Sequence, residues 1–133
     1  MLADIMTRDV LTTTADVSVA DAARLMTERN AGSVCVVDRA GNLEGIITER
    51  DVLRAAATGT DLSKVAIRDW MTGDVITVGP DEIPSEIAQV MQERGFRHLP
   101  VVDRDSLVGI VSMRDLWHFT FLPQEPDDMT LRH

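Results

Sequence analysis

Apolar side chains recur along residues 19–30 with the spacing of an amphipathic helix. The positions that form one stripe, at i, i+3, i+4 and i+7, are Val19, Ala22, Ala23 and Met26. Ser18 and Asp21 are spaced as a capping box at the start of this stripe, and Gly32 stands just past its end. The pattern predicts an amphipathic helix from about residue 19 to residue 30.

Short runs of mostly β-branched residues follow this helix and predict a β-hairpin. The runs occupy 33–38 and 43–48, and the turn-rich segment 39–42 separates them. A second helix is expected over 49–57, and a short strand over 10–14 is expected before the first helix. Together these segments predict the element order β-α-β-β-α.

The chain then repeats this pattern. Residues 4–40 match 69–105 at an offset of 65, and 43–52 match 107–116 at an offset of 64. Identical pairs include Asp4/Asp69, Met6/Met71, Thr7/Thr72, Val36/Val101, Asp38/Asp103, Gly45/Gly109 and Asp51/Asp115. Each copy is too small to bury its own apolar face, so the two copies are expected to pack against each other about a pseudo-twofold axis.

The second copy contains the same predicted elements. They are a short strand over 75–78, a helix that begins at Pro84 and stops at Gly95, strands over 98–103 and 107–112, and a last helix over 113–121. The predicted fold class is therefore α+β, with two β-α-β-β-α repeats at 1–60 and 61–122. Residues 123–133 are polar and acidic without periodicity, and we expect this tail to be mobile.

Composition and charge exclude several classes of protein. The 133 residues are 44% hydrophobic, which suits a globular core, and the single cysteine cannot form an internal disulfide. Lys and Arg number 13 against 22 Asp and Glu, and the net charge of -9 has the wrong sign for binding to nucleic-acid phosphates. No stretch is apolar for the roughly 20 residues of a membrane helix, and the start carries charges where a signal peptide would be apolar. We expect a cytoplasmic protein that binds neither nucleic acid nor membranes.

Polar residues with possible chemistry stand where the last strand of each copy meets the last helix. Thr48 and Asp51 are three residues apart, and so are Ser112 and Asp115. This spacing is that of a capping box, which satisfies free N–H groups at a helix start. The same groups could instead bind a phosphate or the two hydroxyls of a ribose, because a helix N-terminus offers N–H donors and a partial positive charge. Both interpretations are compatible with the residues.

Three motifs, each present twice and in the same order, now suggest a family. They read D-[IW]-M-T-x-D-V-[LI]-T, [SH]-[VL]-[CP]-V-V-D-R and G-I-[IV]-[TS]-x-R-D. The chain resembles a tandem pair of cystathionine-β-synthase (CBS) domains from about residue 2 to residue 118. The resemblance implies a pseudo-symmetric module whose two clefts often hold AMP, ADP, ATP or S-adenosylmethionine, and which commonly forms a disc-shaped dimer.

The resemblance also implies roles for particular residues in the two clefts. In one cleft, Asp51 would bind ribose hydroxyls with Thr48 nearby, and the other copy would complete the site with Ile76, Thr77, Val78, Arg97, His98 and Pro100. In the other cleft, Asp115 and Ser112 would take these roles, with Leu11, Thr12, Thr13, Gly32, Ser33 and Cys35.

The two predicted clefts differ in their basic residues. The second cleft has no basic residue in place of Arg97 or His98, and would rely on Arg8, on Arg114 or on no basic residue at all. A guanidinium can donate two parallel hydrogen bonds to a phosphate. We therefore expect the cleft of Asp51 to hold a charged nucleotide better. Solvated polarity at a strand edge is the alternative interpretation of Arg97 and His98.

Other residues with possible chemistry are assigned to structure. Cys35 lies in an apolar run and is interpreted as a buried packing residue, and the histidines lack the spacing of metal ligands, so no metal site is predicted. Residues 116–122 hold three of the five aromatic residues. Clustered aromatics near a terminus suggest either a partner surface, which favours a homodimer, or a cover for the core within the chain.

The functional hypothesis is a stand-alone regulatory module that binds an adenosine-containing ligand and passes occupancy on through dimer geometry or an unidentified regulated protein. It needs no cofactor, and AMP, ADP, ATP or S-adenosylmethionine is the expected ligand. The alternative is an interaction module with the same fold and no ligand, in which the Thr-x-x-Asp pair and its Ser counterpart act only as helix caps. An enzyme is disfavoured, because the sequence offers no nucleophile with a placed base and no paired catalytic carboxylates.

Overall fold

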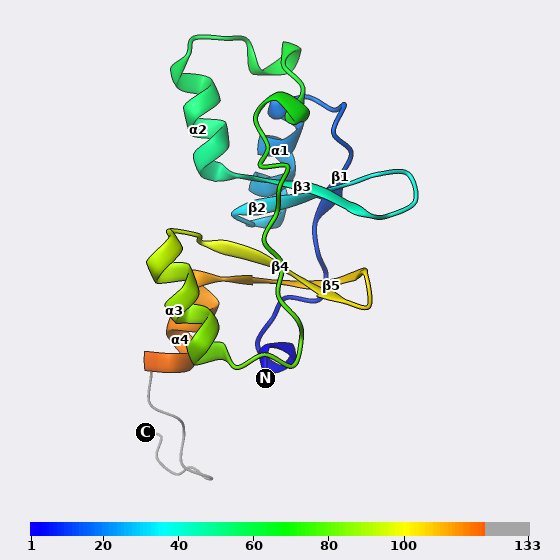
Figure 1. The fold of residues 1–133 in the computed structure, drawn as a ribbon. Coiled ribbons are helices and arrows are strands. Elements are labelled where there is room, and N and C mark those ends of the chain that lie inside the picture. Colours follow the sequence, from blue (N-terminus) through cyan, green and yellow to red (C-terminus); the bar gives the residue numbers. More distant parts are fainter. Residues whose placement is uncertain (122–133) are drawn as a thin grey trace.

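The computed structural model describes residues 1–121, which form two similar halves (Figure 1). The helices are α1 (Val19–Arg29), α2 (Glu49–Ala57), α3 (Pro84–Arg94) and α4 (Met113–Phe121). The strands are β1 (Thr12–Thr13), β2 (Ser33–Val37), β3 (Leu43–Thr48), β4 (His98–Asp103) and β5 (Ser106–Ser112). Short 3-10 helices occur at η1 (Leu2–Asp4), η2 (Leu62–Lys64) and η3 (Ile67–Asp69). The predicted helices and hairpins are confirmed to within two residues at each end.

The two halves are arranged around their β-hairpins. One sheet has the order β1-β2-β3, with β1 parallel and β3 antiparallel to β2, and the other pairs β4 with β5 in antiparallel register. Figure 1 shows the hairpins across the middle of the molecule, with α1 and α2 on one side and α3 and α4 on the other. This is the α+β tandem-repeat architecture that the sequence predicts.

Local chemistry explains where the first helix of each half begins and ends. The Ser18 hydroxyl accepts a hydrogen bond of 3.0 Å from the Asp21 N–H at the start of α1, while Pro84 begins α3, where its missing N–H is harmless. Helix α3 ends at Gly95 in the left-handed conformation. Helix α1 ends in the same conformation at Asn30, two residues before the glycine expected to stop it.

The first few residues of each repeat pack against the other repeat. Leu2 and Met6 are buried in the core of the second half, and Ile67 is buried in the core of the first. Backbone hydrogen bonds of 2.9 Å join Thr7 to Ile110 in both directions. The equivalent pair, Ile46 and Thr72, is joined by bonds of 2.9 and 3.0 Å. This exchange of segments connects two halves that are each too small for a large core of their own.

One predicted strand is reduced to a single bridge. In the first half, the Cys35 N–H donates to the Leu11 carbonyl oxygen at 2.9 Å and holds β1 beside β2. The equivalent of Cys35 in the second half is Pro100, which has no N–H to donate to Ile76. The strand predicted over 75–78 is therefore wrong, and only Val78 pairs, with Val101.

No helix in the described part of the chain is long and apolar enough to cross a membrane. The predicted tail at 123–133 lies outside the described residues.

Candidate functional site

Two clefts open between the halves. The first, called the Asp51 cleft here, has a volume of about 540 Å³ and is lined by Ile46, Thr48, Glu49, Arg50, Asp51, Leu53, Thr72, Asp74, Val75, Ile76, Gly95, Phe96, Arg97, His98 and Leu99. The second, called the Asp115 cleft, has a volume of about 850 Å³ and is lined by Thr7, Asp9, Val10, Leu11, Arg29, Asn30, Ala31, Gly32, Ser33, Glu49, Arg97, His98, Ile110, Ser112, Met113, Arg114, Asp115 and Trp117. Both volumes fall within the range of small-molecule sites.

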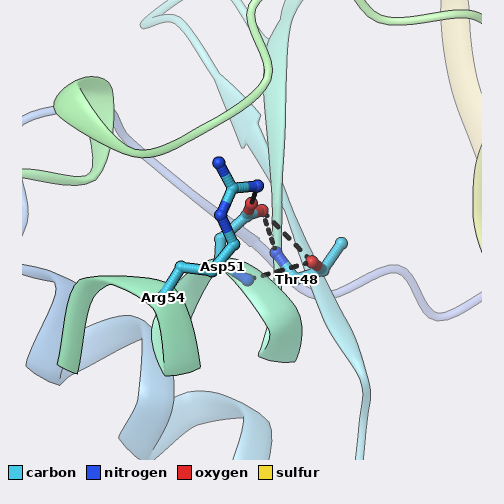
Figure 2. A network of polar contacts seen from close by, with 3 residues as sticks. All are labelled: Thr48, Asp51 and Arg54. Carbon is cyan, nitrogen blue, oxygen red and sulfur yellow. Dashed lines mark hydrogen bonds and ion pairs between the residues drawn. The ribbon is translucent and has the colours of Figure 1, made fainter. Parts of the chain in front are cut away.

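The start of α2 forms one wall of the Asp51 cleft, and Figure 2 shows its polar contacts. One Asp51 carboxylate oxygen, Oδ2, accepts from the Thr48 N–H at 2.9 Å and from the Thr48 hydroxyl at 3.1 Å. The Asp51 N–H in turn donates to that hydroxyl at 3.4 Å, which completes the capping box. The second oxygen, Oδ1, lies 4.0 Å from an Arg54 guanidinium nitrogen. Asp51 therefore faces the cleft with one oxygen used in the cap and the other outside it.

The start of α4 repeats this arrangement in the Asp115 cleft. The Ser112 N–H donates to Asp115 Oδ2 at 3.2 Å, and the Asp115 N–H donates to the Ser112 hydroxyl at 3.1 Å. Both carboxylates thus cap their helices, as one of the two sequence interpretations requires. Both also line a cleft, which the capping interpretation does not require.

The remaining walls of the Asp51 cleft combine apolar side chains with a few charges. Ile46, Leu53 and Ile76 are among the apolar residues, and Leu53 is largely exposed. The Arg97 guanidinium makes no hydrogen bond or ion pair with any residue of 1–121. Apolar walls with a few converging polar groups are typical of a site for a small organic molecule.

The family model of the CBS domain matches residues 2–58 and again residues 67–116. The chain belongs to the CBS domain family. A CBS domain-containing protein of Bacillus subtilis, YhcV, is 35% identical over 114 residues, which cover 85% of this chain and 80% of YhcV.

Solved structures of CBS proteins have the same fold. The CBS domain pair of protein MJ0100, in complex with 5-methylthioadenosine and S-adenosyl-L-methionine, is similar with a TM-score of 0.82 and 32% identity over 90% of this chain and 94% of that chain. A hexameric CBS-CP12 protein from bloom-forming cyanobacteria is similar with a TM-score of 0.80 and 30% identity, over 86% of this chain and 67% of that chain.

The CBS pair brings many of the residues named from the sequence into its clefts. Those that line the Asp51 cleft are Thr48, Asp51, Ile76, Arg97 and His98. Those that line the Asp115 cleft are Leu11, Gly32, Ser33, Ser112 and Asp115. Each cleft is formed by the last strand and helix of one repeat and by segments of the other repeat. Segments far apart in the sequence therefore line the same cleft.

Other named residues lie outside the two linings. They are Thr12, Thr13 and Cys35 of the first half, and Thr77, Val78 and Pro100 of the second. Val78 packs in the core of the second half, and Pro100 and Cys35 are buried in their strands. These three residues pack in the interior and therefore do not reach a cleft. Thr12 and Thr77 are instead exposed outside the clefts, and Thr13 is half-buried.

The basic residues of the CBS pair reach further than the sequence suggested. The positions of the first repeat equivalent to Arg97 and His98 are Gly32 and Ser33, which are not basic, as expected. Arg97 and His98 themselves, however, line the Asp115 cleft as well as the Asp51 cleft. Arg114 lines the Asp115 cleft, whereas Arg8 donates to the Ala3 carbonyl oxygen and is not in the lining. Arg97 and His98 reach both clefts because they stand where β4 begins, between the two openings.

Sequence reasoning also missed several lining residues. Glu49 lies in both linings, and Trp117 in that of the Asp115 cleft. Glu49 occupies the variable position of the third motif, where a single sequence gives no signal. Trp117 is equivalent to Leu53, and this replacement of an aliphatic by an aromatic side chain was the available signal.

His98 forms part of the wall between the clefts. Its Nδ1 atom is buried without a hydrogen-bond partner, and a Cβ atom at Gly32 would lie 2.8 Å from its Nε2 atom. Desolvation lowers the pKa of His98 below its ordinary value, an effect that Glu49 and Asp115 oppose and Arg97 assists. The ring is therefore closely packed and partly desolvated, and its neutral form is favoured.

Protonation of His98 is expected to destabilise the fold as the pH falls. The unfolded chain takes up this proton near pH 6.5, and the folded chain only at lower pH, so the contribution to stability declines below about pH 7 and levels off below the folded-state pKa. Urea unfolding at pH 7.5 and 5.5 measures this loss, which His98→Gln should reduce. The control is His118→Gln at an exposed histidine. An equal loss in His98→Gln and the unchanged protein would contradict the assignment.

Cys35 is buried in β2, and its burial raises the pKa of the thiol to about 12. A thiol with such a pKa is protonated and unreactive at neutral pH. Within residues 1–121, no group of three or more His, Cys, Asp or Glu side chains is arranged to hold a metal ion.

Proposed function

We propose that this CBS pair is a regulatory module that binds an adenosine-containing ligand in the clefts between its repeats. The observation that carries the proposal is the placement of the two capping carboxylates, Asp51 and Asp115, on the walls of two clefts of suitable size. The complex of the MJ0100 pair with 5-methylthioadenosine and S-adenosyl-L-methionine supports the ligand class.

Asp51 can accept hydrogen bonds from the two hydroxyls of a ribose. Its Oδ1 atom is not used in the cap, and a carboxylate carries about four acceptor sites in all. The side chain is 13% exposed, so a ligand hydroxyl would meet it in a partly desolvated setting, where a charge-assisted hydrogen bond is strong. Ile46 and Ile76, which line the same cleft, offer apolar contact to an adenine ring.

A phosphate in the Asp51 cleft would depend on side chains more than on the helix start. In the first turn of α2, the Glu49 N–H donates to the Gly32 carbonyl oxygen at 3.1 Å, and the Asp51 N–H donates to Thr48. These donors are occupied, which weakens the usual anion site of a helix N-terminus. The Arg97 guanidinium is exposed and lines the cleft, so we assign the phosphate to it.

The output of the module is proposed to be a change in dimer geometry or in the binding of a regulated partner, without catalysis and in the cytoplasm. Two observations support self-association. Trp117 and Phe119 on α4 are 49% and 40% exposed, and the similar CBS-CP12 protein is hexameric. Aromatic side chains are enriched at protein interfaces.

Thermal unfolding with AMP, ADP, ATP and S-adenosylmethionine tests the proposal. A ligand at 100 times its dissociation constant should stabilise the chain by about 2.7 kcal/mol. We expect the combined variant Asp51→Asn and Asp115→Asn to lose this shift, because the amide removes the charge and one acceptor from each cleft. Asparagine retains an oxygen that can accept from the cap N–H.

A matched control changes carboxylates at helix starts outside the clefts. Asp21 and Glu86 stand in the first turns of α1 and α3, and neither lines a cleft. The variant Asp21→Asn with Glu86→Gln should keep the ligand shift. If none of the four ligands shifts the unchanged protein, the alternative function, an interaction module without ligand, is supported. If the cleft variant keeps the shift, the ligand binds elsewhere.

A further inference from the structure

Three residues, Glu49, Arg97 and His98, line both clefts of this CBS pair. We infer that the two clefts compete for the single Arg97 guanidinium, so that an anionic ligand in one cleft weakens the binding of a second in the other. The inference rests on the proposed function and adds a regulation to it. The groups that compete for Arg97 are the negatively charged groups of the two ligands, which in nucleotides are the phosphates.

Arg97 is placed to serve either cleft. Its backbone carbonyl oxygen accepts a hydrogen bond of 2.7 Å from the Met113 N–H, which fixes the residue beside the start of α4. Its side chain is exposed, and no residue of the described chain holds the guanidinium in one place. A planar guanidinium that binds one phosphate through two parallel hydrogen bonds cannot bind a second in the same way.

The internal symmetry would supply a second cation, but this chain lacks it. The residue equivalent to Arg97 in the first repeat, 65 positions earlier, is Gly32. The space beside Gly32 is filled by the His98 ring, with Nε2 only 2.8 Å from the position of a Cβ atom. His98 is itself biased toward its neutral form by desolvation, so it adds no firm charge to the wall. The wall between the clefts therefore carries one arginine, Arg97, where a fully symmetric pair of repeats would carry two.

Each of the other arginines in the linings borders only one cleft, and one of them is already paired with a carboxylate. Arg50 lines only the Asp51 cleft, and Arg114 lines only the Asp115 cleft. Arg29 of the Asp115 cleft donates to the Asp9 carboxylate at 2.7 Å. The shared Arg97 is thus the group through which occupancy of one cleft changes the charge that the other cleft offers. Because coupling between sites is reciprocal, the weakening is equal in both directions.

Isothermal titration of the full chain with AMP and with adenosine tests the inference. We expect two AMP molecules to bind, the second with an affinity at least about tenfold lower. The loss of one hydrogen bond to a charged group lowers an affinity by about this factor. In Arg97→Gln, the first AMP should bind about tenfold more weakly and the second as before, so that the two affinities converge. Adenosine has no phosphate, and its binding should not respond to Arg97→Gln.

Two matched variants remove a cation that belongs to one cleft. Arg50→Gln and Arg114→Gln change exposed arginines, as Arg97→Gln does, and each should weaken one AMP site. Two double variants then leave one AMP site each. Arg50→Gln with Asp115→Asn leaves the Asp51 cleft without Arg50, and Arg114→Gln with Asp51→Asn leaves the Asp115 cleft without Arg114. In both backgrounds, the affinity of the remaining site for AMP should still fall in Arg97→Gln. A response in only one of these backgrounds would mean that Arg97 serves one cleft, and would overturn the inference.

Failure of the inference differs from failure of the proposed function. If two AMP molecules bind and the ratio of their affinities is unchanged in Arg97→Gln, the clefts are merely unequal, and the inference is overturned while the proposed function stands. If one AMP molecule binds per chain, both in the unchanged protein and in Arg97→Gln, the inference is likewise overturned and the proposed function stands. If neither AMP nor adenosine binds the unchanged protein, the adenosine proposal fails and the inference fails with it.

Discussion

Replacing Leu2 by alanine is expected to lower the free energy of unfolding by about 2–5 kcal/mol, although the residue is the second of the chain. Leu2 is completely buried in the core of the second half, with Met91 and Leu99 in the same cluster. Truncation removes apolar contact and leaves a cavity that the surrounding β-sheet and helices fill only in part. Urea or thermal unfolding monitored by circular dichroism measures the change.

The repeat supplies a partner experiment. Ile67 is equivalent to Leu2, and it is completely buried in the core of the first half. Ile67→Ala should therefore cost a similar amount, about 2–5 kcal/mol. Leu53→Ala is the control, because Leu53 is 70% exposed and its truncation should change stability by less than about 0.5 kcal/mol. A Leu2→Ala variant as stable as Leu53→Ala would show that the first segment does not belong to the core of the second half.

Gly45→Ala is expected to destabilise the chain by about 1–3 kcal/mol, the usual cost of overpacking. A Cβ atom at this position of β3 would lie 2.7 Å from the Met71 sulfur and 2.7 Å from the Thr72 carbonyl oxygen. The methionine could rotate away, but the carbonyl oxygen belongs to the bridge between Thr72 and Ile46 and cannot move without breaking it. Chemical denaturation measures the loss.

A second glycine provides the matched control. A Cβ atom at Gly73 would meet nothing within 4 Å, so Gly73→Ala should leave the free energy of unfolding nearly unchanged. Gly109, the equivalent of Gly45, faces Met6 and Thr7 in the same way and should respond as Gly45 does. If Gly45→Ala were as mild as Gly73→Ala, the close approach of the exchanged segment would not persist in solution.

Local signals in the sequence were sufficient for the helices and hairpins. The stripe from Val19 to Met26, the proline at the start of α3 and the left-handed Gly95 each act over a few neighbouring residues, so they could be interpreted without the fold. The strand expected over 75–78 failed for a reason outside its own residues. Its partner strand contains Pro100, and strand formation requires both sides of the ladder to offer hydrogen bonds.

The candidate clefts were predictable in part. The motif that contains Thr48 and Asp51 indicated a helix start, and the resemblance to CBS domains implied two clefts. Which side chains turn into a cleft depends on packing. Val78 is withdrawn into the core, and Glu49 lines both clefts without any signal in the sequence.

By itself, the sequence determined the family, the tandem repeat and the order of its elements, because periodicity, caps and internal identity depend on nearby residues or on simple alignment. Only the tertiary structure decided that the segments containing Leu2 and Ile67 exchange halves, and that one arginine, Arg97, borders both clefts. These features arise where distant segments compete for the same space. The Gly32 and His98 contact, 66 positions apart in the chain, illustrates this.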